Sequence, residues 1–235
     1  TYHYGNVADQ VHFAAALDAP HAPEPLAGIP KPRLMFVGAI DSYKLDLPML
    51  TALARQRSEW SFVLLGPVGE ADPDTRITAL QALPNVHVMG LQPYADLPAW
   101  LAHADVALLP LQENTYTQHM FPMKFFEYLA AGRPVVATRI PALRPYASGA
   151  LLCPPDAEAF DAAIATALAG DGPPLQQRLA LAAEHTYESR TRKMLADLQR
   201  AGLLDAASSG RSMLRAQART WPLQRLLMPV LFRSV

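Results

Sequence analysis

The sequence predicts an α/β fold: a doubly wound, Rossmann-like parallel sheet with helices on both faces and extra helices at the carboxyl end. Short apolar runs alternate along the chain with segments of helical periodicity, which is the pattern of strand–helix–strand units. The chain has 235 residues, of which 51% are hydrophobic, enough for a real core in one large or two small domains. No internal repeat of solenoid length interrupts this pattern.

Six strands are expected, at residues 33–40, 61–68, 86–90, 106–111, 134–138 and 150–153. Helices are expected between them at 45–57, 73–83, 94–103 and 122–131, and after the sheet at 156–169 and 175–199. The fourth helix has the clearest signals, because Pro122 suits its first turn, Gly132 suits its end and Pro134 opens the next apolar run. Parallel strands joined in this way place ligands at their carboxyl ends. The loops at that edge are 38–44, 66–72, 90–94, 110–121 and 138–143.

A charged pair lies inside this fourth helix, which is otherwise built for burial. Lys124 and Glu127 are three residues apart, so they share one helix face close to the amino end. Unpaired backbone N–H groups and the helix dipole favour an anion there. A bound phosphate with a ribose beside it would fit; an ordinary surface ion pair of small energetic effect is the alternative.

The segment 122–128 has the pattern P-x-K-x-x-E-Y. It resembles the donor-binding segment of glycosyltransferases of the GT-B fold, in the large retaining family called glycosyl transferase group 1. The resemblance implies that Glu127 holds the ribose hydroxyls of a nucleotide sugar, while nearby backbone amides and basic residues hold the diphosphate. On this segment it assigns donor binding to Pro122, Met123, Lys124 and Glu127.

The loop after the first strand, V-G-A-I-D-S-Y-K, is similar to the V-G-R-L-x-x-x-K element of that family, in which an arginine and a lysine clamp the diphosphate. Gly38 and Lys44 match this element, whereas Ala39 stands where the arginine would be. Only 4 of the 20 basic residues are lysines, so the matching positions of Lys44 and Lys124 support the resemblance. A solvated lysine at a helix start is the alternative for Lys44.

The family's Glu-x7-Glu motif would place its first glutamate at His119. A histidine there could donate a hydrogen bond or, when protonated, a charge to the leaving diphosphate, which makes His119 the candidate catalytic residue. It could equally be a loop histidine with no ligand. The surrounding loop, which contains Thr117, is rich in hydrogen-bonding groups and sits where a sugar-recognition loop is expected. The turn that begins at Gly90 is where backbone groups would bind the base.

The resemblance covers about residues 4–200 and implies three parts. Residues 1–30 would be the interdomain hinge and linker, 31–200 the nucleotide-sugar-binding Rossmann-like domain, and 201–235 a basic, apolar tail. This chain would then be the carboxyl-terminal half of the fold, with an amino-terminal, acceptor-binding half missing. The start at Thr1 without an initiating Met also suggests a fragment.

Composition argues against several classes of protein. A formal net charge of −1 argues against a nucleic-acid binder that works through bulk charge. There is neither a G-x-G-x-x-G nor a P-loop pattern, and no Cys/His cluster has metal-ligand spacing, so no cofactor and no metal are expected. A single cysteine, Cys153, together with the lack of a membrane-spanning run and of a signal-peptide pattern, favours the cytoplasm.

The charge is unevenly distributed, because all 21 acidic residues lie at or before Asp205. Arg211, Arg215 and Arg219 recur every four residues after it and precede an apolar run. A basic stripe beside an apolar patch suits an anionic membrane, so peripheral contact through 211–235 at the inner face of the membrane is one expectation. Packing of carboxyl-terminal helices against the missing half is the other.

We therefore expect a glycosyltransferase of the hexosyltransferase, retaining type that moves a sugar from a UDP- or GDP-sugar to a glycan or lipid-linked acceptor, as in polysaccharide biosynthesis. One alternative is a nucleotide-sugar epimerase of the same fold, against which His119 argues because a carboxylate would be favoured near the sugar. The other is a nucleotide-sugar-binding module that is inactive without its partner half.

Overall fold

The structure is a computed structural model that describes residues 4–19 and 21–203. The chain divides into two compact units. One unit, Gly5–Tyr187, contains the sheet, and the other is formed by the two ends of the chain. The predicted tail arginines Arg211, Arg215 and Arg219 lie outside the described residues, as does the rest of 204–235.

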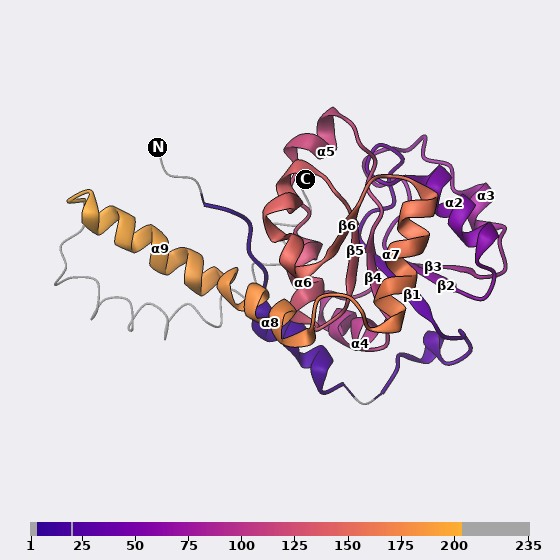
Figure 1. The fold of residues 1–235 in the computed structure, drawn as a ribbon, viewed down its shortest axis with the longest axis horizontal. Helices are drawn as coiled ribbons and strands as arrows, with labels where there is room; N and C mark the ends of the chain where they lie inside the picture. Colours follow the sequence, from indigo (N-terminus) through magenta and orange to yellow (C-terminus); the bar gives the residue numbers. More distant parts are fainter. Residues whose placement is uncertain (1–3, 20, 204–235) are drawn as a thin grey trace. The chain divides into compact units, whose positions relative to one another are not determined.

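The sheet has six strands, all parallel, in the order β3-β2-β1-β4-β5-β6 (Figure 1). They are β1 Arg33–Val37, β2 Ser61–Leu65, β3 Val86–Gly90, β4 Val106–Leu109, β5 Val135–Thr138 and β6 Leu151–Cys153. The central strand β1 pairs Met35 with Val63 on β2 and with Ala107 on β4. The predicted doubly wound fold is therefore confirmed, with the reversal of strand order between β1 and β4.

Helices cover both faces of the sheet, as predicted (Figure 1). The α-helices are α1 Gln10–Ala14, α2 Leu47–Gln56, α3 Thr78–Gln81, α4 Leu97–Ala102, α5 Thr115–His119, α6 Lys124–Ala130, α7 Ala157–Ala169, α8 Leu175–Glu184 and α9 Tyr187–Arg200. Shorter 3-10 turns are η1 Ala15–Leu17, η2 Glu24–Leu26, η3 Tyr94–Asp96 and η4 Pro141–Gly149. Helices α2, α3 and α7 pack on one face, and α1, α4, α6 and α8 pack on the other.

Two predicted helices differ from the structure. The helix expected at 73–83 shrinks to α3, because Asp72 uses its carboxylate to hold the hydroxyls of Ser42 and Thr75 and so fixes a turn before it. The single helix expected at 175–199 is two helices, α8 and α9. The helix is interrupted between them, where Ala8 donates its N–H to the carbonyl of His185 and forms a β-bridge with Thr186.

Helix α6 is packed into the hydrophobic core on most of its sides. Phe125, Phe126, Tyr128 and Leu129 are all fully buried, so most of this short helix is surrounded by protein. Burial of side chains of this size is the main stabilising contribution in a fold of this kind. Its charged pair, Lys124 and Glu127, occurs only in the first turn, which faces the carboxyl edge of the sheet.

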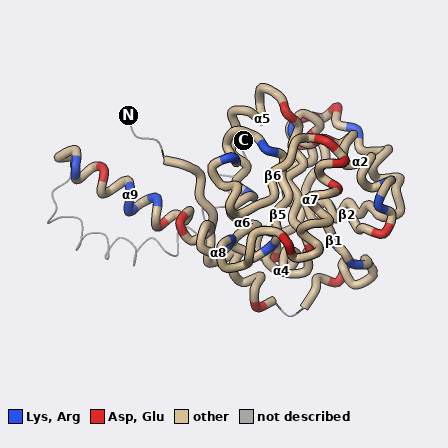
Figure 2. The backbone as a smooth tube through the Cα atoms, viewed as in Figure 1, with Lys and Arg blue, Asp and Glu red and all other residues tan. Residues whose placement is uncertain are grey.

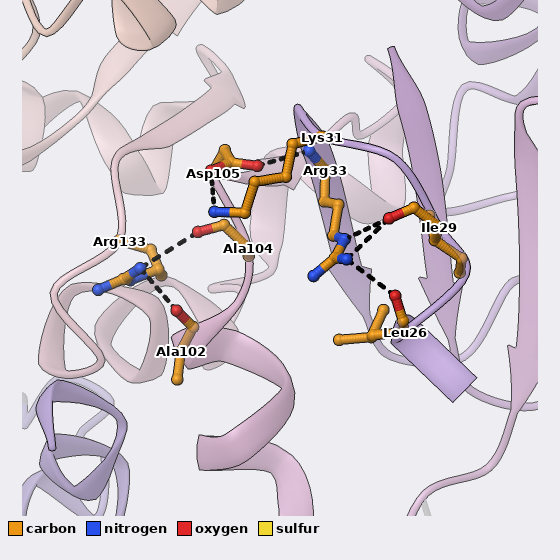
Figure 3. A network of polar contacts seen from close by, with 8 residues as sticks. All are labelled: Leu26, Ile29, Lys31, Arg33, Ala102, Ala104, Asp105 and Arg133. Carbon is orange, nitrogen blue, oxygen red and sulfur yellow. Dashed lines mark hydrogen bonds and ion pairs between the residues drawn. The ribbon is translucent and has the colours of Figure 1, made fainter. Parts of the chain in front are cut away.

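Polar side chains at the amino edge of the sheet are tied to partners within the fold (Figure 3). Arg33 donates to the carbonyls of Leu26 and Ile29 at 2.7–2.9 Å. Asp105 accepts from the backbone N–H of Arg33 at 2.7 Å and from Lys31 at 3.0 Å. Arg133 donates to the carbonyl of Ala102, the last residue of α4, and to that of Ala104. This network secures the starts of β1, β4 and β5.

The second unit consists, where described, of Tyr4 and most of α9. Asp197 is buried there, accepting from the hydroxyl of Tyr4 at 2.8 Å and pairing with Arg200. Helix α9 carries charges of both signs along its length (Figure 2). Among residues 4–19 and 21–203, no helix is long and apolar enough to cross a membrane.

Candidate nucleotide-sugar site

The reversal of strand order between β1 and β4 marks the position of the candidate site. Ligands of open parallel sheets bind at the carboxyl ends of two neighbouring strands whose following connections lead to opposite sides of the sheet. The loop after β1 is locked to the loop after β4 at this point. Gln112 donates from its side chain to the carbonyl of Ser42 at 2.8 Å, and Asn114 donates to the carbonyl of Tyr43 at 2.7 Å. The two loops therefore form one rigid wall.

Lys124 and Glu127 form the ion pair that their spacing predicted. The Lys124 Nζ lies 2.7 Å from Glu127 Oε2, and the side chains are 28% and 9% exposed. The same Nζ lies 6.0 Å from the ring centroid of Phe13 on α1. A carboxylate this buried needs a charged partner or hydrogen bonds. Lys124 supplies one, and its own side chain stays partly exposed.

Tyr128 fixes the distance between this pair and the first loop. Its hydroxyl accepts from the backbone N–H of Val37 at 2.8 Å and lies 3.3 Å from the Val37 carbonyl. Burial, more than any charge, raises the pKa of the Tyr128 phenol, so the group stays neutral and available for these bonds. Helix α6 is thereby attached to the carboxyl end of β1, directly before Gly38.

Gly38 and Gly66 make a close backbone contact at the ends of β1 and β2. Gly66 has a φ of +143°, and a Cβ there would lie 2.0 Å from the carbonyl oxygen of Gly38, so no larger residue fits without backbone movement. Gly38 donates its N–H to Leu65 at 2.8 Å. The missing side chain of Gly66 thus lets the loop after β2 approach Gly38, the glycine predicted to bind the donor.

Lys44 reaches the same edge from the first loop. Its Nζ lies 3.4 Å from the buried carboxylate of Asp41 and 5.1 Å from the ring centroid of Tyr43, and its side chain is 24% exposed. Burial lowers the pKa of Lys44, but the two nearby tyrosines and Asp41 together raise it above its ordinary value. Lys44 is therefore a partly sheltered cation rather than a freely solvated lysine.

Thr117 and His119 lie on α5, which the sequence did not predict as a helix. Thr117 is fully buried and completes a capping box with Asn114, and its hydroxyl donates to the carbonyl of Gln112 at 2.6 Å. This placement favours a role in shaping the loop. His119 is exposed, with its Nδ1 2.8 Å from the carbonyl of Thr115.

Pro122 and Met123 lead into α6. Pro122 is buried and its carbonyl accepts from Phe125 at 3.0 Å, which starts the first turn. Met123 is 39% exposed. The two residues therefore set the direction in which α6 begins, at the predicted position.

Gly90 ends β3 with a φ of +67° and accepts from Gly66 N–H at 2.8 Å, which begins the predicted base-binding turn. Tyr94 follows this turn and stacks on His12 of α1, with ring centroids 4.4 Å apart. Burial and then the negative charge of Glu127 raise the pKa of Tyr94, so Tyr94 lies within electrostatic reach of the ion pair. Sequence reasoning missed His12 and Tyr94 at this site, because nothing in their local pattern links residues 82 positions apart.

The fold and this edge define the class of protein: a doubly wound α/β domain with a partly buried ion pair, Lys124–Glu127, at the carboxyl edge of the sheet. A family model described as glycosyl transferases group 1 matches residues 31–185. The chain belongs to this family. It is 37% identical over 108 residues to TuaH of Bacillus subtilis, described as a putative teichuronic acid biosynthesis glycosyltransferase. That match covers 46% of this chain and 27% of TuaH.

Solved structures share the fold. HepE of Anabaena, crystallised with UDP, superposes with a TM-score of 0.64 at 15% identity, covering 83% of this chain and 56% of HepE. A trehalose-phosphate synthase of Burkholderia xenovorans, crystallised with glucose-6-phosphate, gives 0.63 at 19% identity, covering 83% and 50%. The sucrose-phosphate synthase of Thermosynechococcus elongatus gives 0.58 at 24%, covering 84% and 49%. The chain spans about half the length of these structural relatives.

Proposed function

We propose that this chain is the carboxyl-terminal, donor-binding half of a glycosyltransferase that takes its sugar from a nucleoside diphosphate sugar. The observation that carries the proposal is the Lys124–Glu127 pair, in which a nearly buried carboxylate and the ammonium group of a partly exposed lysine lie together at the carboxyl edge of the sheet. Carboxylates bind vicinal hydroxyls through charge-assisted hydrogen bonds, and ammonium groups bind phosphate. The two groups side by side suit a ribose joined to a diphosphate.

Each residue then has a role. Glu127 accepts hydrogen bonds from the ribose hydroxyls, and Lys44 and Lys124 neutralise the diphosphate. Backbone groups near Gly38, Pro122 and Met123 approach the phosphates, and the turn after Gly90 holds the base. Thr117 keeps the β4 loop in shape. We favour UDP over GDP as the nucleotide, since HepE was crystallised with UDP.

In sugar transfer the bond between the anomeric carbon and the diphosphate oxygen breaks, and negative charge grows on the departing diphosphate. Positive groups fixed in place before this step stabilise that charge. His119 is the remaining candidate for this role. If the Nδ1–H of His119 donates to Thr115, the other ring nitrogen is an acceptor in the neutral ring. His119 could therefore donate to the diphosphate only as an imidazolium.

In this proposal the acceptor is a glycan or a lipid-linked sugar, bound by an amino-terminal half of the enzyme. Retention of anomeric configuration and a hexose as the transferred sugar belong to the same proposal, as does action in the cytoplasm at the inner face of the membrane.

Flotation of the chain with anionic liposomes tests the proposed membrane contact. Salt-sensitive binding that is lost on truncation at Gly210 would support membrane contact through 211–235, and an absence of binding by the full-length enzyme would exclude it.

Calorimetric titration of the chain with UDP, GDP and ADP tests the proposed function. We expect one of the first two to bind at a single site, with uridine or guanosine alone binding more weakly because the phosphate contacts are lost. Binding of none of the three would remove the proposal. A nucleotide-sugar-binding module without chemistry of its own would bind the nucleotide equally well. An assay of sugar transfer by the full-length protein separates the two functions, because a glycosyltransferase transfers the sugar and a binding module does not.

A further inference from the structure

Asp41 is the most deeply buried acid at the candidate site, and no local sequence pattern predicts a role for it. The residue follows β1 by four positions and its side chain has no exposed surface. A buried carboxylate is costly unless both of its oxygens have partners. The partners of the two Asp41 oxygens therefore indicate which groups this buried charge stabilises.

The two oxygens of Asp41 bind two different loops. Oδ1 accepts from the backbone N–H of Ala71, in the loop after β2, at 3.1 Å. Oδ2 lies 3.4 Å from the Nζ of Lys44 in the loop after β1. The Asp41 carbonyl in addition accepts from the N–H groups of Lys44 and Leu45, each at 3.0 Å. Asp41 thus holds Lys44 by both its backbone and its ammonium group.

A second set of contacts holds the same two loops together. Ser42 donates its hydroxyl to Asp72 and its N–H to Thr75, the latter at 3.0 Å. The Ser42 hydroxyl and, after it, the Thr75 hydroxyl both donate to Asp72 and lower the pKa of its carboxyl, against the opposing effect of burial. The backbone of the loop that carries Lys44 is therefore held in place by the loop after β2. Asp41 connects this held backbone to the Lys44 ammonium group.

Lysine needs such a link if it is to bind a phosphate in one place. Its four-carbon stem is flexible, and its ammonium group carries three donors. One donor directed at Asp41, with a second shared with the Tyr43 side chain, fixes the position of the nitrogen and leaves a donor for a ligand. The entropy of ordering the stem is then lost on folding and not on binding.

We propose that Asp41 is a positioning residue, whose buried carboxylate fixes the ammonium group of Lys44 at the place where a nucleoside diphosphate binds. This inference rests on the proposed function, since it takes Lys44 to be a diphosphate ligand. Coulomb's law alone gives the opposite expectation. Removing a negative charge beside an anion site should strengthen anion binding, so the direction of the effect separates the two accounts.

The test compares Asp41→Asn, Lys44→Met and the double variant in calorimetric titrations with UDP and with uridine. The asparagine can still accept from Ala71, but its amide group cannot hold the lysine ammonium as a carboxylate does. We expect Asp41→Asn to weaken UDP binding about fivefold and to leave uridine binding unchanged. In the Lys44→Met background the same change should have no further effect, because the residue through which Asp41 acts is gone.

Asp105→Asn is the matched control, since Asp105 also pairs with a lysine and a backbone N–H but lies at the amino edge. We expect it to lower the melting temperature without changing UDP affinity. Unchanged or tighter UDP binding by Asp41→Asn, equal losses for UDP and uridine, or a loss that persists without Lys44 would each overturn the inference. If the wild-type chain itself fails to bind UDP, the proposed function fails first.

A measurement on the wild-type chain covers the case in which Asp41→Asn does not fold. NMR relaxation of the lysine side chains reports how far each ammonium group is restricted. Lys44 should be clearly more ordered than Lys193, which is exposed and pairs with no acid among the described residues. A Lys44 as mobile as Lys193 would contradict the inference.

Discussion

At the amino edge of the sheet Arg33 and Arg133 donate to backbone carbonyls within the fold (Figure 3). At the carboxyl edge Lys44 and Lys124 instead pair with carboxylates and keep part of each side chain exposed. Arginine has five donors in a fixed plane and suits several carbonyls at once, while lysine is a flexible point charge. Burial lowers the pKa of Arg133, whereas the pKa of Lys44 is raised. The arginines at the amino edge are thus satisfied by backbone groups of the fold, whereas the lysines at the carboxyl edge stay partly exposed, as the proposed diphosphate site requires.

Arg33→Met should show the largest effect, and on stability alone. The change leaves the buried carbonyl of Ile29 without its side-chain donor and the carbonyl of Leu26 with only the N–H of Ile29. An unsatisfied buried group costs about 1–3 kcal/mol. We expect the free energy of unfolding to fall by roughly 2–4 kcal/mol, measured by urea denaturation. UDP affinity below the transition should stay within about twofold of the wild type; a larger loss would show that the two edges are not independent.

Glu127→Ala should show the next largest effect, this time on binding. One or two charge-assisted hydrogen bonds to ribose contribute about 1.5–3 kcal/mol each, and a tenfold loss of affinity needs only about 1.4 kcal/mol. We expect UDP binding to weaken at least tenfold in calorimetry. Circular dichroism would establish that the variant is folded. Wild-type affinity in a folded Glu127→Ala chain would contradict the assignment of Glu127 to the ribose.

Lys44→Met and Lys124→Met should each weaken UDP binding selectively. The lost interaction is with phosphate charge, so affinity for UDP should fall by about 1–2 kcal/mol while affinity for uridine hardly changes. Parallel titrations with the two ligands measure the difference. Because Lys124 also pairs with Glu127, equal losses for both ligands in Lys124→Met would assign Lys124 to the carboxylate rather than to the diphosphate.

Tyr128→Phe should show the smallest effect, and it should lower both the stability of the chain and its affinity for UDP. It removes the hydroxyl that accepts from the buried N–H of Val37, which costs about 1–2 kcal/mol of stability. It also loosens the attachment of α6 to the end of β1, so UDP affinity should fall about twofold to threefold. Thermal melting and calorimetry on the same preparation check the two parts. An unchanged melting temperature would show that this bond does not hold α6.

The sequence predicted the carboxyl edge far better than the amino edge. Strand positions follow from apolar runs, and the Lys124–Glu127 pair follows from helix spacing, so local pattern was enough for both. The Arg33 network depends on carbonyls of η2, and the His12–Tyr94 stack depends on tertiary packing. Neither has a local signal, because backbone carbonyls carry no residue identity and the stacked rings are far apart in sequence.

The helix errors have the same origin. Residues 73–83 have helical composition, but Asp72 binds two hydroxyl groups from other positions and shortens the helix to α3. The break between α8 and α9 follows from the pairing of Ala8 with Thr186. In both places a long-range contact overrides local propensity.

The most direct test of the central claim, that the carboxyl edge binds the nucleoside diphosphate, is an amide NMR map of the chain titrated with UDP. The account predicts shifts at Gly38, Lys44, Lys124 and Glu127, with the amides of Arg33, Asp105 and Arg133 unmoved. Shifts centred on the amino-edge residues, or saturation with UDP that leaves the amides around Glu127 unchanged, would contradict it.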